Sequence, residues 1–308
     1  TMFDVVASNG GTDLAGSVWI PRSEVRAGVL MFPGSGPADR HNDVVFPPIR
    51  DRLVARGIAV ASFDKRGVGS SGGDWRTVGL DVLASDAVAE MDVLEADGGV
   101  PAGRVGLLGH SQGGWVVLEA AADERTAFVV THSGPGVAVW EQVGHAARMA
   151  LASTTATASA IDAAAVLLVE GMEVLREGRP WQAFADRVAG PLLAPHTALL
   201  ERAGFAWPTS SDRRFLRLIL GYDPAPALER LHRPVLAVHG AADALVPVDR
   251  SVEAFERSVG RRGLLTTIVF PGADHRLRIG DPPRPVPGYP DAIADWILRV
   301  TSGKGVHP

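Results

Sequence analysis

The pentapeptide Gly109-His110-Ser111-Gln112-Gly113 decides how this chain is expected to fold. It has the pattern G-x-S-x-G, follows the apolar run 104–108, and precedes residues 114–121, which suit the start of a helix. A strand, a sharp turn and a helix form the context in which this pattern becomes a nucleophile elbow. Its glycines let strand and helix approach closely while the serine adopts a strained backbone conformation. The sequence therefore predicts an exposed serine hydroxyl at the carboxyl end of a central strand.

Strand-like and helix-like patterns alternate on both sides of this motif. Apolar runs typical of buried strands occupy residues 28–32, 58–63, 105–108, 128–131, 234–239 and 264–270. Helical spacing occurs at residues 49–56, 80–96 and 289–300. Asn9-Gly10-Gly11 separates two further β-type segments and predicts a hairpin. Such alternation produces right-handed crossovers, so the expected fold class is α/β, with a mainly parallel central sheet flanked by helices.

Residues 135–226 interrupt this alternation. They contain no convincing strand, and their helical patterns cover 137–149, 156–177, 181–188, 195–203 and 212–220. Helices inserted between two strands of a sheet are typical of a cap or lid. We therefore expect a core formed by residues 1–134 and 227–308, and a helical cap formed by residues 135–226.

The cap carries large apolar side chains with two candidate roles. They are Trp140, Met149, Met172, Trp181, Phe184, Phe205, Trp207 and Phe215. A cap above the carboxyl edge of the sheet would present some of them to the site as an apolar wall. Alternatively, the insertion is a dimerisation surface, and a homodimer is then the expected partner.

Two further residues complete a catalytic pattern with Ser111. A serine nucleophile needs a base, and the base needs an orienting group. Asp243 follows the strand at 234–239 by a few residues, and His275 follows the strand at 264–270. The order Ser, Asp, His is the one expected for strands that end at a common edge. The alternatives are that Asp243 caps a helix beginning near residue 248 and that His275 is an ordinary loop histidine.

Acyl transfer also requires donors for a developing oxyanion. The backbone N–H of Gln112, at the start of the helix, is one candidate. The second is expected in the loop after the strand at 28–32, where we favour the N–H of Ser35, with Gly36 as the competitor.

Together these residues resemble the α/β-hydrolase superfamily, in its serine esterase and acyl-hydrolase branch. The loop 64–72 looks like the D-x-R-G-x-G-x-S-x-G turn of that superfamily, and 240–243 and 272–275 match its acid and histidine segments. The loop 34–40 is similar to one in bacterial acyl esterases related to dienelactone-hydrolase-like and prolyl-oligopeptidase-like enzymes. The chain differs in having Pro33-Gly34 where many relatives have His-Gly, and in lacking the cysteine of true dienelactone hydrolases. The resemblance implies the α/β-hydrolase fold. We expect Asp64 and Arg66 to fix their loop, the alternative being contact with the substrate.

Composition excludes several classes of function. The net charge of −5 and the absence of basic runs argue against a nucleic-acid partner. No cysteine is present, which excludes disulfides and thiolate chemistry. The histidines lack metal-ligand spacing, so we expect no metal and no cofactor. The first residues have no signal-peptide pattern and no long window suits a bilayer, so we expect a cytoplasmic protein without a membrane partner.

The sequence therefore predicts an enzyme that hydrolyses a small to medium apolar ester through an acyl-enzyme on a Ser111–His275–Asp243 triad. Thioesterase, peptidase, C–C bond hydrolase and acyltransferase chemistry remain open on the same residues. A non-catalytic ligand-binding protein of the same fold is the alternative from another class.

Overall fold

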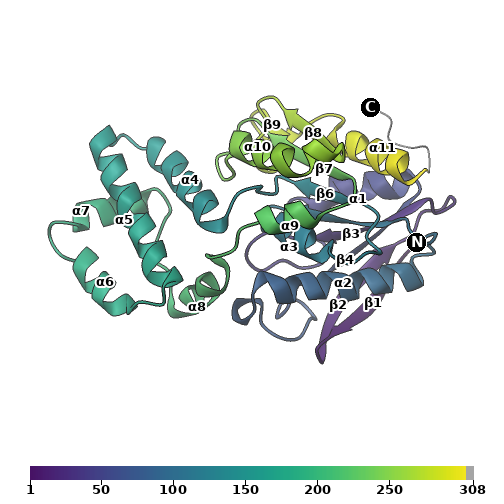
Figure 1. Cartoon of the computed structure of the whole chain (residues 1–308), viewed down its shortest axis with the longest axis horizontal. Helices are drawn as coiled ribbons and strands as arrows, with labels where there is room; N and C mark the ends of the chain where they lie inside the picture. Colours follow the sequence, from purple (N-terminus) through teal and green to yellow (C-terminus); the bar gives the residue numbers. More distant parts are fainter. Residues whose placement is uncertain (303–308) are drawn as a thin grey trace.

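The computed structural model describes residues 1–302, and its centre is an eight-stranded sheet (Figure 1). The strands are β1 (Met2–Asn9), β2 (Thr12–Trp19), β3 (Ala27–Phe32), β4 (Ile58–Phe63), β5 (Val105–His110), β6 (Val129–His132), β7 (Val235–Gly240) and β8 (Leu265–Phe270). Every residue of β3, β4, β5, β6 and β7 is buried. Burial on both faces explains why these strands read as continuous apolar runs in the sequence.

The strand order is β1-β2-β4-β3-β5-β6-β7-β8. From β4 to β8 every neighbouring pair is parallel, whereas β2 is antiparallel to both β1 and β4. Gly10 and Gly11 form the β1–β2 turn, and both have positive φ, as a two-residue primed turn requires. The expected mainly parallel sheet and the hairpin are confirmed.

Helices cover both faces of the sheet. On one face, α1 (Phe46–Ala55) and α11 (Tyr289–Thr301) pack with side chains of β3, β5 and β7. On the other face lie α2 (Leu80–Asp97), α3 (Gln112–Ala120) and α10 (Val248–Ser258). This three-layer arrangement brings the carboxyl ends of β3, β5, β7 and β8 to one edge, from which the loops that carry the predicted site residues emerge.

The remaining short elements lie in connections. They are the 3-10 turns η1 (Trp75–Thr77) and η2 (Gly260–Arg262) and the two-residue strands β9 (Arg278–Ile279) and β10 (Arg284–Pro285). Within residues 1–302, no helix has both the length and the hydropathy needed to cross a bilayer.

The insertion forms a group of helices at one end of the molecule, on the left of Figure 1. It contains α4 (Val139–Ala152), α5 (Ala158–Arg176), α6 (Trp181–Val188), α7 (Ala194–Arg202) and α8 (Ser210–Ile219), near the positions expected from helical spacing. The boundary expected at residue 226 falls inside α9 (Ala225–Arg230), which packs against α3 and α10 of the core.

The insertion begins and ends at one place. The backbone N–H of Val139, the first residue of α4, donates to the carbonyl of Tyr222 at 3.1 Å, so the outgoing and returning chain lie side by side. Phe215 of α8 also stacks edge-on against Trp75, with ring centroids 4.8 Å apart. These two contacts join the helical group to the core, together with a hydrogen bond from Gln142 Nε2 to the carbonyl of Leu245 at 2.7 Å and an ion pair of Glu141 with Arg250 at 2.9 Å.

Candidate active site

The turn between β5 and α3 holds Ser111 in a strained backbone conformation. Its φ of 54° and ψ of −122° lie outside the regions that a residue with a side chain ordinarily adopts. Glycine is required beside it, because a Cβ on Gly113 would lie 2.6 Å from the carbonyl oxygen of Phe32 and one on Gly109 would overlap the backbone of Gly113. The N–H of Ser111 donates to the carbonyl of His132 at 3.0 Å, which anchors the turn to β6. The elbow geometry expected from the sequence is present.

Asp243 and His275 meet at the same edge of the sheet. Asp243 Oδ2 lies 2.7 Å from Nδ1 of His275. The other oxygen, Oδ1, accepts backbone N–H bonds from Leu245 at 2.8 Å and Val246 at 3.0 Å. The Asp243 side chain is fully buried, so these bonds hold its carboxylate in one orientation. The N-cap of α10 is Pro247, so the alternative in which Asp243 caps that helix does not hold.

The neighbouring carboxylate is engaged elsewhere. Asp274 Oδ2 accepts from Arg278 Nη2 at 2.8 Å and Nε at 3.1 Å, while Oδ1 accepts the backbone N–H of Arg276 at 2.8 Å. Such a pairing leaves Asp274 without a hydrogen bond to His275.

Ser111 and His275 face a common cleft of about 510 Å³. Within residues 1–302, no hydrogen bond joins Ser111 Oγ to His275. Catalytic hydrogen bonds are often long without substrate and shorten when it binds, so this spacing is compatible with a nucleophile and its base. The structure brings all three predicted catalytic residues together.

The loop after β3 lies directly against the nucleophile. A Cβ added to Gly34 would lie 3.1 Å from Ser111 Cβ. Ser35 lines the cleft and Gly36 does not. Within the described chain, the backbone N–H groups of Ser35 and Gln112 donate to no protein acceptor. Both are therefore free to bind an oxygen in the cleft, and since Ser35 and not Gly36 lines it, Ser35 stays the preferred second donor.

Three buried histidines lie beneath His275. The ring of His110 is 5.1 Å from that of His275, and its Nδ1 is 3.0 Å from Nδ1 of His132. Burial lowers the pKa of His132 to about 3 and that of His239 to about 4, and it holds the pKa of His110 well below 6.5. All three are neutral at pH 7. His110 is therefore packed between His132 and His275 and carries no charge.

One free positive charge lies in the cleft. Arg276 lines it, and within residues 1–302 its guanidinium makes no ion pair, whereas Arg278 is held by Asp274. Apolar side chains form other parts of the wall, and Val44 and Leu245 among them are about half exposed. Sequence reasoning assigned no role to these residues, because only the folded loops bring them to the cleft.

The cationic residues of the loop after β4 are buried. Asp64 pairs with Arg40 at 2.8 Å and Arg66 pairs with Asp86, in line with the expectation that Asp64 and Arg66 fix this loop. Lys65, between them, donates from Nζ to the carbonyls of Gly34 and Gly36. The sequence analysis missed this contact, because a lysine after a strand ordinarily lies at the surface.

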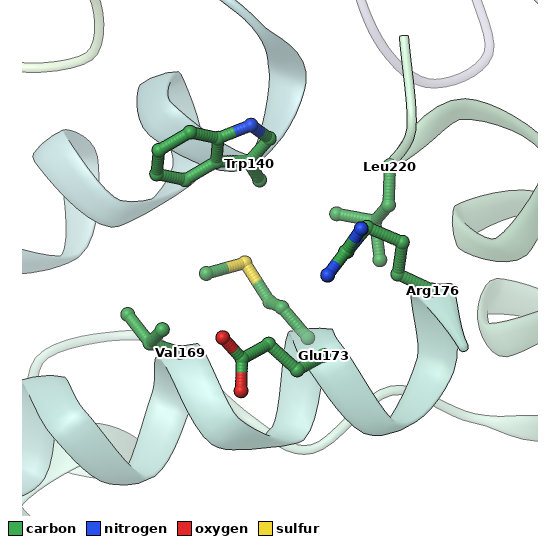
Figure 2. A pocket seen from close by; sticks show the side chains of 6 residues that line it. Trp140, Val169, Glu173, Arg176 and Leu220 are labelled. Atoms are coloured by element: carbon green, nitrogen blue, oxygen red, sulfur yellow. The ribbon is translucent and has the colours of Figure 1, made fainter. Parts of the chain in front are cut away.

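A second cavity, of about 280 Å³, lies within the insertion (Figure 2). Trp140 of α4 faces Val169 and Glu173 of α5 across it, and Leu220 and Arg176 close one end. None of the three predicted catalytic residues lines this cavity.

The aromatic side chains of the insertion do not form the expected wall above Ser111. From residues 135–226, the cleft is lined by Pro135 and Gln142. Trp181, Phe184 and Trp207 pack against one another inside the helical group, with ring centroids 5.0–6.0 Å apart. With Leu167 and Val174 of α5 and Val188 of α6 they form a small cluster of their own, which joins α5 to α6.

Within the described part of the chain, no group of three or more His, Asp or Glu residues is placed to hold a metal ion.

A family model described as X-Pro dipeptidyl-peptidase (S15 family) matches residues 10–276. No curated protein matches the chain.

Several solved structures share the fold. The Pyrococcus furiosus esterase Pf2001 has 19% identity and a TM-score of 0.61, over 98% of this chain and 90% of that one. A 2,6-dihydroxy-pseudo-oxynicotine hydrolase has 18% identity and a TM-score of 0.63, over 99% and 70% of the two chains. Est1E from Butyrivibrio proteoclasticus has 16% identity and a TM-score of 0.55, over 96% of each chain. At these identities the similarity concerns the fold, which is that of the α/β-hydrolases.

Proposed function

The chain belongs to the X-Pro dipeptidyl-peptidase (S15) family of α/β-hydrolases, and we propose that it is a serine hydrolase that cleaves carboxylic esters. The observation that carries the proposal is the meeting of three side chains at one sheet edge. Ser111 stands on a strained elbow, His275 faces the same cleft, and Asp243 lies 2.7 Å from the imidazole. Serine, base and orienting carboxylate in this arrangement are what acyl transfer requires.

In the proposed reaction, Ser111 Oγ attacks the ester carbonyl carbon while Nε2 of His275 takes the hydroxyl proton. Asp243 accepts the Nδ1–H bond, which fixes the tautomer and stabilises the imidazolium. The tetrahedral oxyanion accepts hydrogen bonds from the N–H groups of Gln112 and Ser35. His275 then protonates the leaving alcohol, and an acyl-enzyme remains on Ser111.

The second half of the reaction uses the same groups in reverse. His275 takes a proton from water as the water oxygen attacks the acyl carbonyl, and the second oxyanion occupies the same two N–H groups. Collapse of this intermediate returns the proton to Ser111 and releases the carboxylic acid. The neutral state of His110 and His132 leaves Asp243 as the charged partner of the imidazolium.

The charge of the cleft favours an ester over an X-Pro peptide. A dipeptidyl-peptidase acts on a peptide with a free α-ammonium group, for which a carboxylate is the natural partner. Among the residues that line the cleft, Asp274 alone carries a carboxylate, and Arg278 occupies it. Arg276 adds an unpaired positive charge, which disfavours an ammonium group.

The size and walls of the cleft support the substrate class expected from the sequence. A volume of about 510 Å³ suits a small to medium molecule. Val44, Val45, Trp115 and Leu245 supply apolar surface. We propose an ester with an apolar acyl or alcohol part as the substrate.

The cytoplasmic location expected from the sequence remains a prediction.

The second candidate is an X-Pro peptidase, which the family match favours. A fluorophosphonate probe should label the wild-type protein on Ser111, and p-nitrophenyl esters should be hydrolysed faster than X-Pro-p-nitroanilides. Labelling with faster anilide cleavage would replace the esterase by the peptidase. Absence of labelling would instead favour a non-catalytic ligand-binding protein.

A further inference from the structure

Lys65 is a buried cation without an acidic partner. Its exposed fraction is 3%, and no ion pair involves it within residues 1–302. The preceding residue, Asp64, is occupied by Arg40, and the following residue, Arg66, occupies Asp86. A lysine is almost never fully buried without compensation, so its position requires an explanation.

The compensation comes from the loop beside the nucleophile. Lys65 Nζ donates to the carbonyl oxygen of Gly34 and, at 3.0 Å, to that of Gly36. The same nitrogen lies 5.6 Å from the ring centroid of Trp75, within the range of a cation–π contact. Lys65 therefore bridges the two carbonyls that flank Ser35 and holds residues 34–36 in place.

One of these carbonyls belongs to the peptide unit that carries the Ser35 N–H. The Gly34 carbonyl and the Ser35 N–H are the two ends of one amide group. A donor on the carbonyl oxygen draws electron density from the amide and makes its N–H a stronger donor, because hydrogen bonds in a chain polarise one another. The N–H itself has no protein acceptor in the described chain. It is thus available to a ligand oxygen in the cleft.

The loop is also close enough to Ser111 for its position to matter. Only 3.1 Å would separate a Cβ on Gly34 from Ser111 Cβ. Burial lowers the pKa of Lys65 to about 7. Both the ammonium and the neutral amine have at least two N–H groups, so both carbonyls stay paired in either state.

We propose that Lys65 is a positioning residue for the oxyanion hole: it aligns and polarises the Gly34–Ser35 amide so that the Ser35 N–H binds the tetrahedral intermediate. The inference rests on the proposed serine hydrolase function. This role differs from that of the neighbouring ion pairs of Asp64 and Arg66, which hold the loop after β4 and make no hydrogen bond to residues 34–36.

The test compares Lys65→Met with Arg66→Lys. The first variant keeps an unbranched side chain of similar length but removes both donors, and the second weakens a neighbouring buried ion pair. We expect Lys65→Met to lower kcat about tenfold with KM within twofold of wild type, because the contact acts in the transition state. The inhibition constant of an alkyl boronic acid, which forms a tetrahedral adduct on serine, should weaken by the same factor. Arg66→Lys should lower Tm and leave kcat and the boronic acid constant unchanged.

A purely structural lysine would give a different pattern. Equal losses in the two variants, or a change in KM alone for Lys65→Met, would overturn the proposal. If Lys65→Met does not fold, Lys65→Leu provides the same comparison, since its side chain also removes both donors.

Hydrogen exchange separates this inference from the proposed function. In Lys65→Met, the backbone N–H groups of residues 34–36 should exchange faster than in Arg66→Lys at matched stability, whether or not the protein turns over an ester. Equal exchange would refute the positioning role. A wild-type protein inert to phosphonate and esters would refute the hydrolase and not the hold on the loop.

Discussion

Asp243 Oδ2 lies 2.7 Å from His275 Nδ1, although Asp274 is the carboxylate adjacent to that histidine in sequence. Arg278 distinguishes the two carboxylates, because its Nε and Nη2 both donate to Asp274 Oδ2. Asp243 has no arginine partner in the described residues, and its bonds come from two backbone N–H groups and the imidazole.

The two carboxylates should therefore differ sharply in mutants. Asp243→Asn should lower kcat by about 10³–10⁴-fold, because the histidine loses its tautomer and the partner of its cationic form. Asp274→Asn should lower Tm by a few degrees and change kcat by less than about tenfold. Steady-state kinetics on one p-nitrophenyl ester decides between them, and a reversed ranking would reassign the triad acid.

Ser111→Ala should abolish turnover without loss of fold. We expect a loss of about 10⁴–10⁶-fold in kcat, since no acyl-enzyme can form. Tm should stay within about 2 °C of wild type, because the Ser111 hydroxyl caps no helix. Ser133→Ala is the matched control: Ser133 also has positive φ, and its buried hydroxyl has no partner. Mass spectrometry should place a phosphonate adduct on Ser111, and an adduct elsewhere would contradict the assignment.

The free charge of Arg276 should appear in substrate preference. For a glutarate half-ester of p-nitrophenol relative to the neutral valerate ester, Arg276→Glu should lower the ratio of kcat/KM values about three- to tenfold. The effect should shrink between 50 and 500 mM salt. Arg261→Glu, the same change in η2 before β8 and outside the cleft, should leave the ratio unchanged. Identical ratios in all three proteins would show that Arg276 does not face the substrate.

The buried histidines should make the protein sensitive to acid. The pKa values of His132 and His239 lie at about 3 and about 4, whereas unfolded histidine titrates near 6.5. Below pH 6.5 the unfolded chain therefore binds more protons than the folded one, and the free energy of unfolding falls as pH falls. At pH 5 the two residues together should remove about 4 kcal/mol.

Urea unfolding at pH 7.5 and pH 5.0 measures this loss. His239→Leu should reduce it by about 2 kcal/mol, the share of one histidine, and it should fold because both ring nitrogens of His239 lack partners and an apolar side chain fills the same space. His41→Asn, at an exposed position, should not change it. If the free energy of unfolding fell by the same amount between pH 7.5 and pH 5.0 in wild type and in His239→Leu, buried His239 would not be a cause of the acid sensitivity.

The aromatic cluster of the insertion should serve stability and not specificity. Trp207→Ala should destabilise the helical group by about 3 kcal/mol, since the indole packs against Trp181 and Phe184. The ratio of kcat/KM between butyrate and acetate esters should remain that of wild type. A changed ratio in a folded Trp207→Ala variant would restore the idea of a lid that shapes the site.

The sheet and the elbow could be predicted because their signals are local. A strand buried on both faces must be apolar throughout, and Gly109 and Gly113 are required by the backbone that surrounds them. Ser111, Asp243 and His275 could be found because each follows a strand, and parallel strands end at one edge.

Other features depend on contacts between distant segments. The burial of Lys65 requires the loop 33–37 and Trp75 to close over it, and no spacing in the sequence records that closure. The place of the insertion depends in the same way on the contact between Phe215 and Trp75. Its helices could be predicted from their periodicity. Periodicity does not say where the helices lie relative to Ser111, and for that reason the apolar wall expected there was wrong.

The hydrogen bond between Val139 and Tyr222 brings the two ends of the insertion together, so that the insertion is a segment that could be exchanged as a unit. Since the chain leaves the core and returns to it at one point, the strand order of the sheet does not depend on which sequence lies between these two residues. A graft from another protein would need to match one short gap, to cover the ring of Trp75 that Phe215 now shields, and to replace the contacts that Glu141 and Gln142 make with the core. A single exchange of sequence would therefore replace the outer helices and leave the sheet edge with Ser111, Asp243 and His275 in place, while the part of the cleft wall that Gln142 supplies would change.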